Sequence, residues 1–372
     1  MDWSESGYLA LSALNVKDGY IDFSQDVHYG NQELYDKWMS GKELHRGQVL
    51  FTTEAPMGNV AQVPDNKGYI LSQRTIAFDV EEEILSENFL ATLLRTPNVF
   101  NDLTALSSGG TAKGVSQKSL SGLDVVIPKN IDEQNKLADY FINIDNLITL
   151  HQRKYDKLTK VKKSMLEKMF PKNGTNVPEI RFKGFTDAWE QRKLGTLCSL
   201  ITKGTTPKDK SGNGEVNFVK VENIDTDNGE VTSMSKISVE EHEGYLKRSR
   251  LEENDILFSI AGTLGRVSVV KPSILPANTN QALAIIRTNE GYIPYLTTVL
   301  KGPAVEDFIR RNPTIGAQPN LSLEQVNNLD ISYPEYDEQV KIGDYFALLD
   351  NLITLHQRKF FIYKSNTNLH FK

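Results

Sequence analysis

The chain has 372 residues, of which 39% are hydrophobic and 24% charged, a composition typical of globular proteins and a length that favours two domains. Its 42 Lys and Arg against 48 Asp and Glu give a net charge of -6. This charge excludes a protein that coats nucleic acid with a uniformly basic surface, but it does not exclude local basic faces. A single cysteine, Cys198, excludes a disulfide framework and a cysteine-based zinc site, so we expect a buried structural thiol. Since neither a signal peptide nor an apolar run of membrane-spanning length is present, the sequence predicts a soluble, cytoplasmic protein.

The first half of the chain is predicted to be a mixed α/β domain that leads into a long helix. Short strand-like runs lie between Gly, Pro, Asn and Asp turns at residues 48–53, 69–71 and 75–78. An apolar segment follows at residues 88–95. From residue 132 to 169, apolar side chains keep a spacing of mostly three or four residues, which indicates one helix. Asp132 is its predicted N-cap, and Pro171 and Gly174 end the pattern. A helix of this length is typical of a coiled coil.

The second half shows the same order of elements. Its predicted strands are residues 216–221, 255–260, 266–270 and 282–287. Residues 292–311 have helical spacing, and a second long helix is predicted to begin at an N-cap formed by Asp337.

An internal duplication accounts for this parallel order. The ten residues DNLITLHQRK occur at 145–154 and again, unaltered, at 350–359, and the longer segments 132–154 and 337–359 are identical at 17 of 23 positions. Elsewhere the halves share apolar strand residues and turn glycines, while the polar residues between them differ. The sequence therefore predicts two copies of one α/β fold with different surfaces, joined by nearly identical helices.

No convincing set of catalytic residues is found. Motifs of zinc proteases, P-loop proteins, dinucleotide-binding domains, amino-methyltransferases and nucleases are missing, and residues 110–114 (GTAKG) are interpreted as a glycine turn. His151 and His356 occupy equivalent positions in the two repeats, which favours packing or partner contact over catalysis. We therefore predict no catalytic residue, no metal site and no cofactor.

Local features nevertheless point to nucleic acid. Residues 153–172 carry eight Lys and Arg against two acidic residues, which is either a solvated helix face or a stripe for phosphates or an acidic partner. In the second half, polar side chains lie at strand ends and turns; Asn and Gln amides match adenine edges, Arg matches guanine, and Lys suits phosphates. The candidate DNA-binding residues are Lys203, Thr205, Lys208, Lys210, Lys220, Arg266, Asn278, Asn280 and Gln281.

Several segments together resemble the specificity (S) subunit of type I restriction-modification systems. They are PEIRFKGFTDAWEQRKLG, KGTTPKDKSG, SIAGTLGR and DEQ…DYF…LDNLITLHQRK, beginning at residues 178, 203, 259 and 337. The resemblance covers essentially the whole chain and implies two β-rich target-recognition domains that alternate with two long helices packed as an antiparallel coiled coil. The implied parts are a first recognition domain at 1–130, a central helix at 131–175, a second recognition domain at 176–335 and a C-terminal helix at 336–372.

The same resemblance implies a non-catalytic subunit. Its partners would be double-stranded DNA, two methyltransferase (M) subunits and, in the full complex, restriction (R) subunits, with no membrane. Each domain would read one half of a split DNA site, and the coiled coil would fix the spacing and dock the M subunits. The residues expected in the coiled coil or against a partner are Phe141, Ile144, Leu147, Ile148, Leu158, Val161, Met165, Phe346, Leu349, Leu352 and Ile353.

The chain departs from the family pattern in two places. Met1 aligns near Ser211, so the first half lacks a counterpart of residues 178–210, and residues 155–171 have no counterpart after Lys359. We expect a shortened first domain, a second helix that is shorter or altered beyond Lys359, and more secure half-site reading by the second domain. The alternatives are a self-sufficient nuclease or methyltransferase, and a protein-binding scaffold or regulator derived from a truncated specificity subunit.

Overall fold

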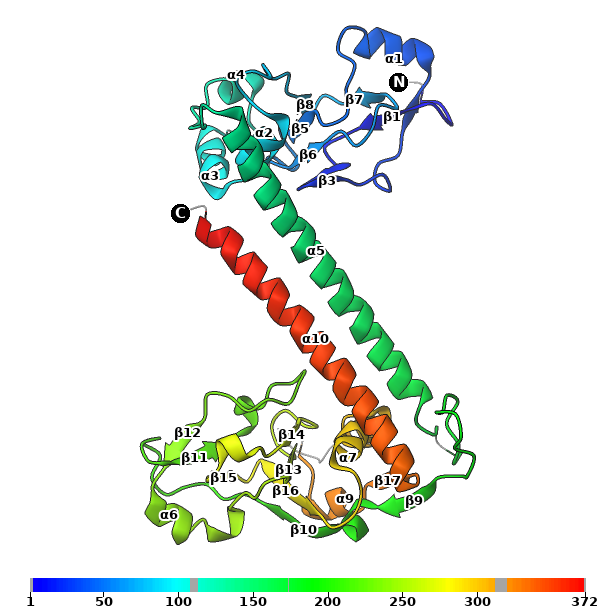
Figure 1. Ribbon diagram of the computed structural model, residues 1–372, viewed down its shortest axis with the longest axis vertical. Coiled ribbons are helices and arrows are strands. Elements are labelled where there is room, and N and C mark those ends of the chain that lie inside the picture. The colour runs from blue at the N-terminus through cyan, green and yellow to red at the C-terminus, as the bar shows by residue number, and fades with distance from the viewer. Residues whose placement is uncertain (1–2, 108–112, 173, 312–319, 371–372) are drawn as a thin grey trace. The chain divides into compact units, whose positions relative to one another are not determined.

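The structure is a computed structural model that describes residues 3–107, 113–172, 174–311 and 320–370 (Figure 1). The chain divides into two compact units: unit 1 contains Met1–Leu150 and Lys359–Lys372, and unit 2 contains His151–Arg358. Two long helices, α5 (Ile131–Lys168) and α10 (Tyr336–His370), contribute one part to each unit. Within the described ranges, no helix is long and apolar enough to cross a bilayer. Most of the glycine turn predicted at residues 110–114 lies outside the described residues.

Unit 1 contains two small sheets, with strand orders β4-β1-β7 and β6-β5-β8, and a β2-β3 pair. Its strands are β1 (Tyr8–Leu11), β2 (Val16–Lys17), β3 (Tyr20–Ile21), β4 (Tyr29–Gly30), β5 (Val49–Thr52), β6 (Val60–Gln62), β7 (Tyr69–Leu71) and β8 (Thr75–Ala77). Its short helices are α1 (Gln32–Met39), α2 (Glu87–Leu94), α3 (Pro97–Leu106) and α4 (Gln117–Leu120). The strands predicted at 48–53, 69–71 and 75–78 are confirmed, and the segment at 88–95 is helix α2.

Unit 2 contains sheets of strand order β12-β11-β15 and β10-β16-β13-β14, and a β17-β9 pair. Its strands are β9 (Glu190–Lys193), β10 (Cys198–Lys203), β11 (Val216–Val219), β12 (Ser235–Ile237), β13 (Ile256–Ser259), β14 (Val267–Val269), β15 (Ala277–Thr279), β16 (Leu283–Thr288) and β17 (Asp330–Tyr333). Its short helices are α6 (Val239–Glu243), α7 (Ile293–Leu300), α8 (Pro303–Arg311), α9 (Leu323–Asn327), and the 3₁₀ turns η1 (Leu194–Leu197), η2 (Val221–Asn223), η3 (Lys247–Ser249) and η4 (Pro272–Ile274). The four predicted strands are confirmed, and the helical segment at 292–311 is two helices separated at Gly302.

The predicted duplication is present in the topology. β1 pairs antiparallel with β4 and parallel with β7, and β11 pairs in the same way with β12 and β15. The central strands β5 and β13 are also alike, because each buries side chains on both of its faces. Leu50 of β5 packs into one core while Val49 and Phe51 pack into another, because successive side chains of a strand point to opposite faces. Leu257 and its neighbour Phe258 of β13 are divided between two cores in the same manner. The chain is therefore a mixed α/β protein made of two copies of one fold.

Two strands of unit 2 have no counterpart among the described residues of unit 1. β10 pairs antiparallel with β16, and β9 pairs with β17. Both belong to the segment for which the first half of the sequence has no equivalent. As a result β16 is paired on both edges, whereas its counterpart β8 is paired only with β5 in the part of unit 1 that the structure describes.

The starts of the long helices correct one prediction. The side chain of Asn130 accepts hydrogen bonds from the backbone N–H groups of Asp132 and Glu133, at 2.7 and 3.4 Å, so Asn130 caps α5. The predicted N-caps Asp132 and Asp337 were wrong: both lie in the first helical turn, where their charge favours the positive end of the helix dipole. The helix α10 continues through Lys359 to His370, so the divergent sequence beyond Lys359 is still helical.

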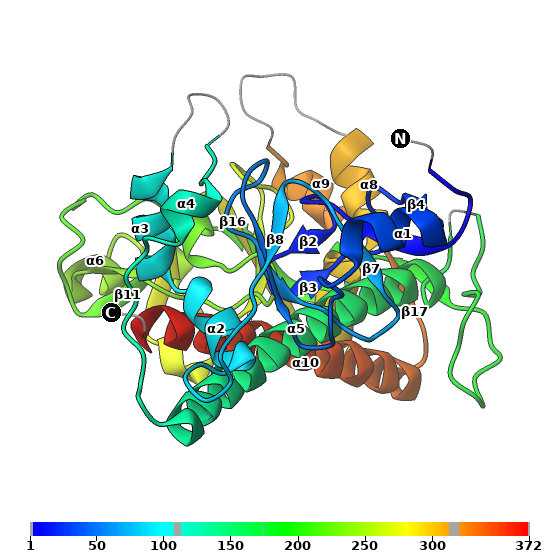
Figure 2. The ribbon, with the colours of Figure 1, turned by 90° about the horizontal axis from the view of Figure 1, so that it is seen from above.

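In unit 2 the two long helices lie side by side and run in opposite directions (Figures 1 and 2). His151 Nδ1 lies 2.7 Å from His356 Nδ1, and Lys162 Nζ lies 2.5 Å from an Asp350 carboxylate oxygen. The numbering rises along α5 while it falls along α10, which is the antiparallel arrangement. Because His151 and His356 are equivalent in the repeat, their contact marks a local two-fold relation between the helices. Packing between the helices, one of the two interpretations that the sequence left open for these histidines, is therefore observed.

The residues predicted for the coiled coil are distributed over both units. In unit 2, Leu158, Met165, Phe346 and Leu349 pack in the main core, Ile353 is buried, and Val161 and Leu352 are half-buried. In unit 1, Ile144 is buried, and Phe141, Leu147 and Ile148 are half-buried. Each of the eleven predicted residues is therefore at least partly buried.

A buried ion pair fastens the start of α10 to unit 2. The Glu338 side chain is 0% exposed and accepts two hydrogen bonds from Arg181, at 2.7 and 2.8 Å, and one of 3.0 Å from Trp189 Nε1. Trp189 itself is buried in the main core of the unit. Both partners come from the segment that precedes β9, so the charged cluster holds that segment against the long helix.

Cys198, at the start of β10, is predicted to react slowly with thiol reagents. It is half-buried, packs against the main core, and burial raises its pKa from 9.0 to about 11. A raised pKa leaves less thiolate at pH 8, and only part of this loss is offset by the greater nucleophilicity of the more basic thiolate. We expect iodoacetamide to modify native Cys198 at least tenfold more slowly than the urea-unfolded chain, measured by mass spectrometry. Equal rates would contradict the buried-thiol prediction.

Candidate nucleic-acid interface

One edge of unit 2 collects several of the predicted DNA-binding residues. β11 and β15 are parallel, with Val219 opposite Thr279, so the residues that follow them leave the sheet side by side. These residues are Lys220 after β11, and Asn280 and Gln281 after β15. Polar side chains at the carboxyl ends of parallel strands are well placed for binding, because the following loops open there.

The end of β10 joins the same edge. Thr205 N–H donates to the Thr279 carbonyl at 2.9 Å, and the Thr206 hydroxyl is hydrogen-bonded to the Gln281 side chain. Gly204 makes this approach possible, because a Cβ there would lie 2.1 Å from the Thr279 carbonyl oxygen. The segment KGTTPK is therefore held close to the sheet at its start.

The turn between β13 and β14 completes the edge. Ile260 N–H donates to the Ala282 carbonyl at 2.8 Å, which places this turn beside Gln281. Arg266 Nη1 donates to the carbonyls of Val221 and Ile224, at 3.1 and 2.6 Å. We call these four segments, residues 203–206, 220–224, 260–266 and 279–282, the recognition edge of unit 2.

The side chains on this edge differ in what they can offer a ligand. Lys203 and Gln281 are exposed, and Lys220 and Asn280 are partly exposed. Among the predicted residues farther along the loop, Lys210 is exposed and Lys208 Nζ lies 4.7 Å from the ring centre of Tyr245. Arg248, which the sequence did not single out, donates to the Thr205 hydroxyl at 3.2 Å.

Asn278 was wrongly predicted to bind DNA. It is 0% exposed in the middle of β15, and its amide donates to the Leu246 carbonyl at 2.9 Å and to the Ser249 hydroxyl at 3.2 Å. A buried amide needs such partners, so the polar residue type signals an internal hydrogen-bond network at this position. Arg266 is half-buried and braces η2 through backbone carbonyls, so it supports the edge more than it extends from it.

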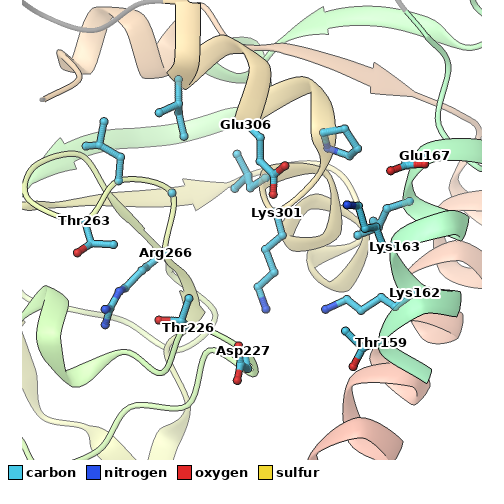
Figure 3. A pocket seen from close by; sticks show the side chains of 16 residues that line it. Thr159, Lys162, Lys163, Glu167, Thr226, Asp227, Thr263, Arg266, Lys301 and Glu306 are labelled. Carbon is cyan, nitrogen blue, oxygen red and sulfur yellow. The ribbon is translucent and has the colours of Figure 1, made fainter. Parts of the chain in front are cut away.

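A cavity of about 660 Å³ lies next to the β13–β14 turn within unit 2 (Figure 3). Lys162 of α5 and Lys301, just after α7, extend into it, opposite Arg266. Burial lowers the pKa of Lys301.

The basic stripe at residues 153–172 is partly engaged in ion pairs. Lys162 is paired with Asp350, and Lys168 with Glu179 at 3.1 Å. These two lysines are therefore neither simply solvated nor free to bind phosphate.

Unit 1 has an equivalent edge that carries different side chains. Asn59 donates to the Val16 carbonyl at 2.8 Å, and its N–H donates to the Thr52 hydroxyl at 2.9 Å. Arg266 makes the matching backbone bond to the Ser259 hydroxyl at 2.7 Å, so Asn59 and Arg266 brace the same turn in the two copies. After β7, unit 1 presents Gln73 and Arg74, both exposed.

The candidate residues chosen from the sequence did not include these two residues of unit 1. Gln73 aligns with Gln281 in the repeat, and Arg74, which lies 2.6 Å from Glu54, takes the place of Ala282. The signal that would have found them is the repeat itself, extended from the second half to the first.

The structure contains two copies of one mixed α/β fold, and equivalent edges of the two copies carry different polar side chains. A family model described as the type I restriction modification DNA specificity domain matches residues 17–160 and 186–360, which is most of the chain. The chain therefore belongs to the type I restriction modification DNA specificity family.

Individual proteins show the same relation. The type I restriction enzyme EcoBI specificity subunit of Escherichia coli is 22% identical over 355 residues, covering 88% of this chain and 72% of its own length. The MjaVIII specificity subunit of Methanocaldococcus jannaschii is 20% identical over 367 residues, covering 95% and 82%. The crystal structure of the S subunit of the M. genitalium type I restriction-modification system has the same fold, with a TM-score of 0.62 and 14% identity over 100% of this chain and 89% of its own.

Proposed function

We propose that this chain is the DNA specificity subunit of a type I restriction-modification complex, and that each recognition edge reads one half of a bipartite site in double-stranded DNA. The observation that carries the proposal is that equivalent turns of the two copies are braced in the same way, while the exposed polar side chains beside them differ. Asn59 and Arg266 brace equivalent turns, while Arg74 stands where unit 2 has Ala282. A scaffold that is repeated while its exposed polar groups differ is suited to binding two different short sequences.

The exposed groups have the chemistry for base and phosphate contacts. The amides of Gln73 and Gln281 can make paired hydrogen bonds to adenine, and the Arg74 guanidinium can do so to guanine. Lys203 and Lys220 can neutralise phosphates, which position a protein on DNA without reading its sequence. Because the net charge of the chain is -6, we expect partner subunits to contribute to phosphate binding.

We infer that catalysis belongs to the partners, two methyltransferase (M) subunits and the restriction (R) subunits, and that the long helices dock the M subunits. The repeated segment DNLITLHQRK supports two equivalent docking sites. Leu150 and its repeat partner Leu355 are identical and 44% and 45% exposed, so each copy of the segment offers the same apolar side chain to a partner.

Replacing these leucines is predicted to remove M subunits one at a time. Leu150→Asp or Leu355→Asp should each lower the number of bound M subunits from two to one, and the double variant should bind none, measured by native mass spectrometry of the co-purified complex. Leu348→Asn is the matched control, because Leu348 is also exposed on α10 but has Asn143 as its repeat partner. If Leu348→Asn had the same effect as Leu355→Asp, the docking site would be misplaced.

The function is tested by assembling the chain with its methyltransferase partner and measuring methylation across a genome. The proposal expects one bipartite motif with two dissimilar halves. A complex that binds DNA in retardation assays without any sequence preference would instead favour a scaffold or regulator. Methylation or cleavage by the purified chain alone would contradict the non-catalytic assignment.

A further inference from the structure

Lys301 of unit 2 has an equivalent cation in unit 1, Arg95. Arg95 directly follows α2 and Lys301 directly follows α7, with nearly the same backbone conformation, φ being -88° and -89° and ψ -3° in both. Each side chain also reaches the same turn glycine. A Cβ at Gly19 would lie 3.3 Å from the Arg95 guanidinium, and a Cβ at Gly229 would lie 3.4 Å from Lys301 Nζ. The two cations therefore occupy equivalent places in the repeat.

In unit 1 this cation lies between two carboxylates. Arg95 Nε donates to Asp18 at 2.5 Å, and Arg95 Nη1 donates to Asp145 at 2.6 Å. Asp18 belongs to the turn between β2 and β3, and Asp145 belongs to α5, so the arginine joins this turn to the long helix. Its positive charge is compensated within the protein.

In unit 2 the same cation lacks both of these partners. Asn228 precedes the turn glycine as Asp18 does in unit 1, but its side chain is neutral. Asp350, the repeat partner of the second carboxylate, is paired with Lys162 at 2.5 Å. Among the described residues, no carboxylate forms an ion pair with Lys301. Two lysines thus share one nearby carboxylate, which leaves one positive charge over.

This positive charge lies in the cavity of about 660 Å³ that Figure 3 shows. Lys162 and Lys301 are half-buried where they extend into it, whereas the carboxylates that line it, those of Glu167, Asp227 and Glu306, are exposed. Solvent and salt screen the exposed carboxylates more than the half-buried cations, so the inner part of the cavity is positive. Its volume is in the range of pockets that hold small molecules.

From this uncompensated cation and the cavity around it, we propose that unit 2 has a binding site for a small phosphate-bearing anion, with Lys301 and Lys162 as its cationic contacts. A phosphate oxygen takes the place that the Asp18 carboxylate holds beside Arg95 in unit 1. Lysine suits this role, because its ammonium group is a compact charge with three donors. The Thr226 hydroxyl, which also lines the cavity, can donate a further hydrogen bond. Since both lysines are half-buried, a free anion reaches them more easily than a phosphate of a duplex does.

Calorimetric titration of the full chain with inorganic pyrophosphate tests this site without DNA or methyltransferase, so the result is independent of the proposed function. We expect saturable binding of one pyrophosphate per chain. Lys301→Gln should weaken binding at least tenfold, because it removes the uncompensated charge. Asn228→Asp should also weaken it at least tenfold, because it supplies the carboxylate that Asp18 supplies in unit 1. Aspartate can still accept the hydrogen bond that Asn228 Oδ1 accepts from Glu230 N–H at 2.7 Å, so this variant keeps the turn.

A matched control is Lys183→Gln, which removes an exposed lysine of unit 2 outside the cavity and should leave pyrophosphate affinity unchanged. If pyrophosphate did not bind, or bound Lys301→Gln as tightly as the unmodified chain, the proposal would be overturned. A retardation assay with duplex DNA distinguishes the other source of phosphate. If Lys301→Gln weakened DNA binding while pyrophosphate did not bind, the site would take a phosphate of the DNA backbone and no free anion.

Discussion

Replacing Glu338 by alanine is expected to lower the free energy of unfolding of unit 2 by about 3–5 kcal/mol, because it leaves the largely buried Arg181 without its counter-charge. It also removes the acceptor for Trp189 Nε1. Trp189 is the single tryptophan of unit 2, since Trp3 and Trp38 lie in unit 1. Urea unfolding followed by tryptophan fluorescence, with the transition of unit 2 assigned through a Trp3→Phe, Trp38→Phe background, measures the effect.

The repeat provides the matched control for this experiment. Glu133→Ala makes the same substitution at the equivalent position of unit 1, where the side chain is exposed and has no described ion-pair partner. It should leave the stability unchanged. If the two variants were equally stable, the cluster of Arg181, Trp189 and Glu338 would not hold the segment before β9 against α10.

The second large effect is expected on DNA recognition. In a complex with the methyltransferase partner, Gln281→Ala should weaken binding to the cognate site by about 1–3 kcal/mol, roughly 5- to 150-fold, and relax the preference in one half of the motif only. Arg74→Ala should do the same in the other half. Methylation motifs from cells that carry each variant, and retardation assays at fixed salt, measure both the position and the size of the change.

Lys203→Ala distinguishes phosphate contacts from base contacts. It should weaken binding to all sequences about equally and reduce the slope of log affinity against log salt by about one, because one fewer counterion is released. If Gln281→Ala and Arg74→Ala altered the same half of the motif, or if neither altered any preference, the assignment of one edge to each half-site would fail.

Much of the fold could be predicted because the chain contains an internal repeat, so that its two halves can be compared with each other. The repeat of DNLITLHQRK showed that two copies of one fold exist, and the length of the apolar pattern from residue 132 showed a long helix. The N-caps were misplaced by two residues in α5, because Asn130, Asp132 and Glu133 all suit a helix start. Only the geometry shows that the Asn130 side chain reaches the two N–H groups.

The candidate DNA-binding residues stay a prediction. Lys203, Lys220 and Gln281 lie on segments that come together at one edge of unit 2, because each follows or ends a strand there. Asn278 was wrong because a strand residue alternates between faces, and the sequence does not tell which polar residue turns inward to a network such as that of Leu246 and Ser249. Gln73 and Arg74 were not among the candidates, because all the candidate DNA-binding residues come from the second half of the chain.

By itself, the sequence determined the duplication, the mixed α/β character, the two long helices and the family, since these depend on residue types in order along the chain. The tertiary structure decided which polar groups reach solvent, that His151 meets His356, and that Glu338 is buried while the identical residue Glu133 is exposed. The physical reason is that burial and pairing depend on neighbours distant in sequence. The sequence records the same glutamate whether its carboxylate is paired with an arginine from another segment or exposed to water.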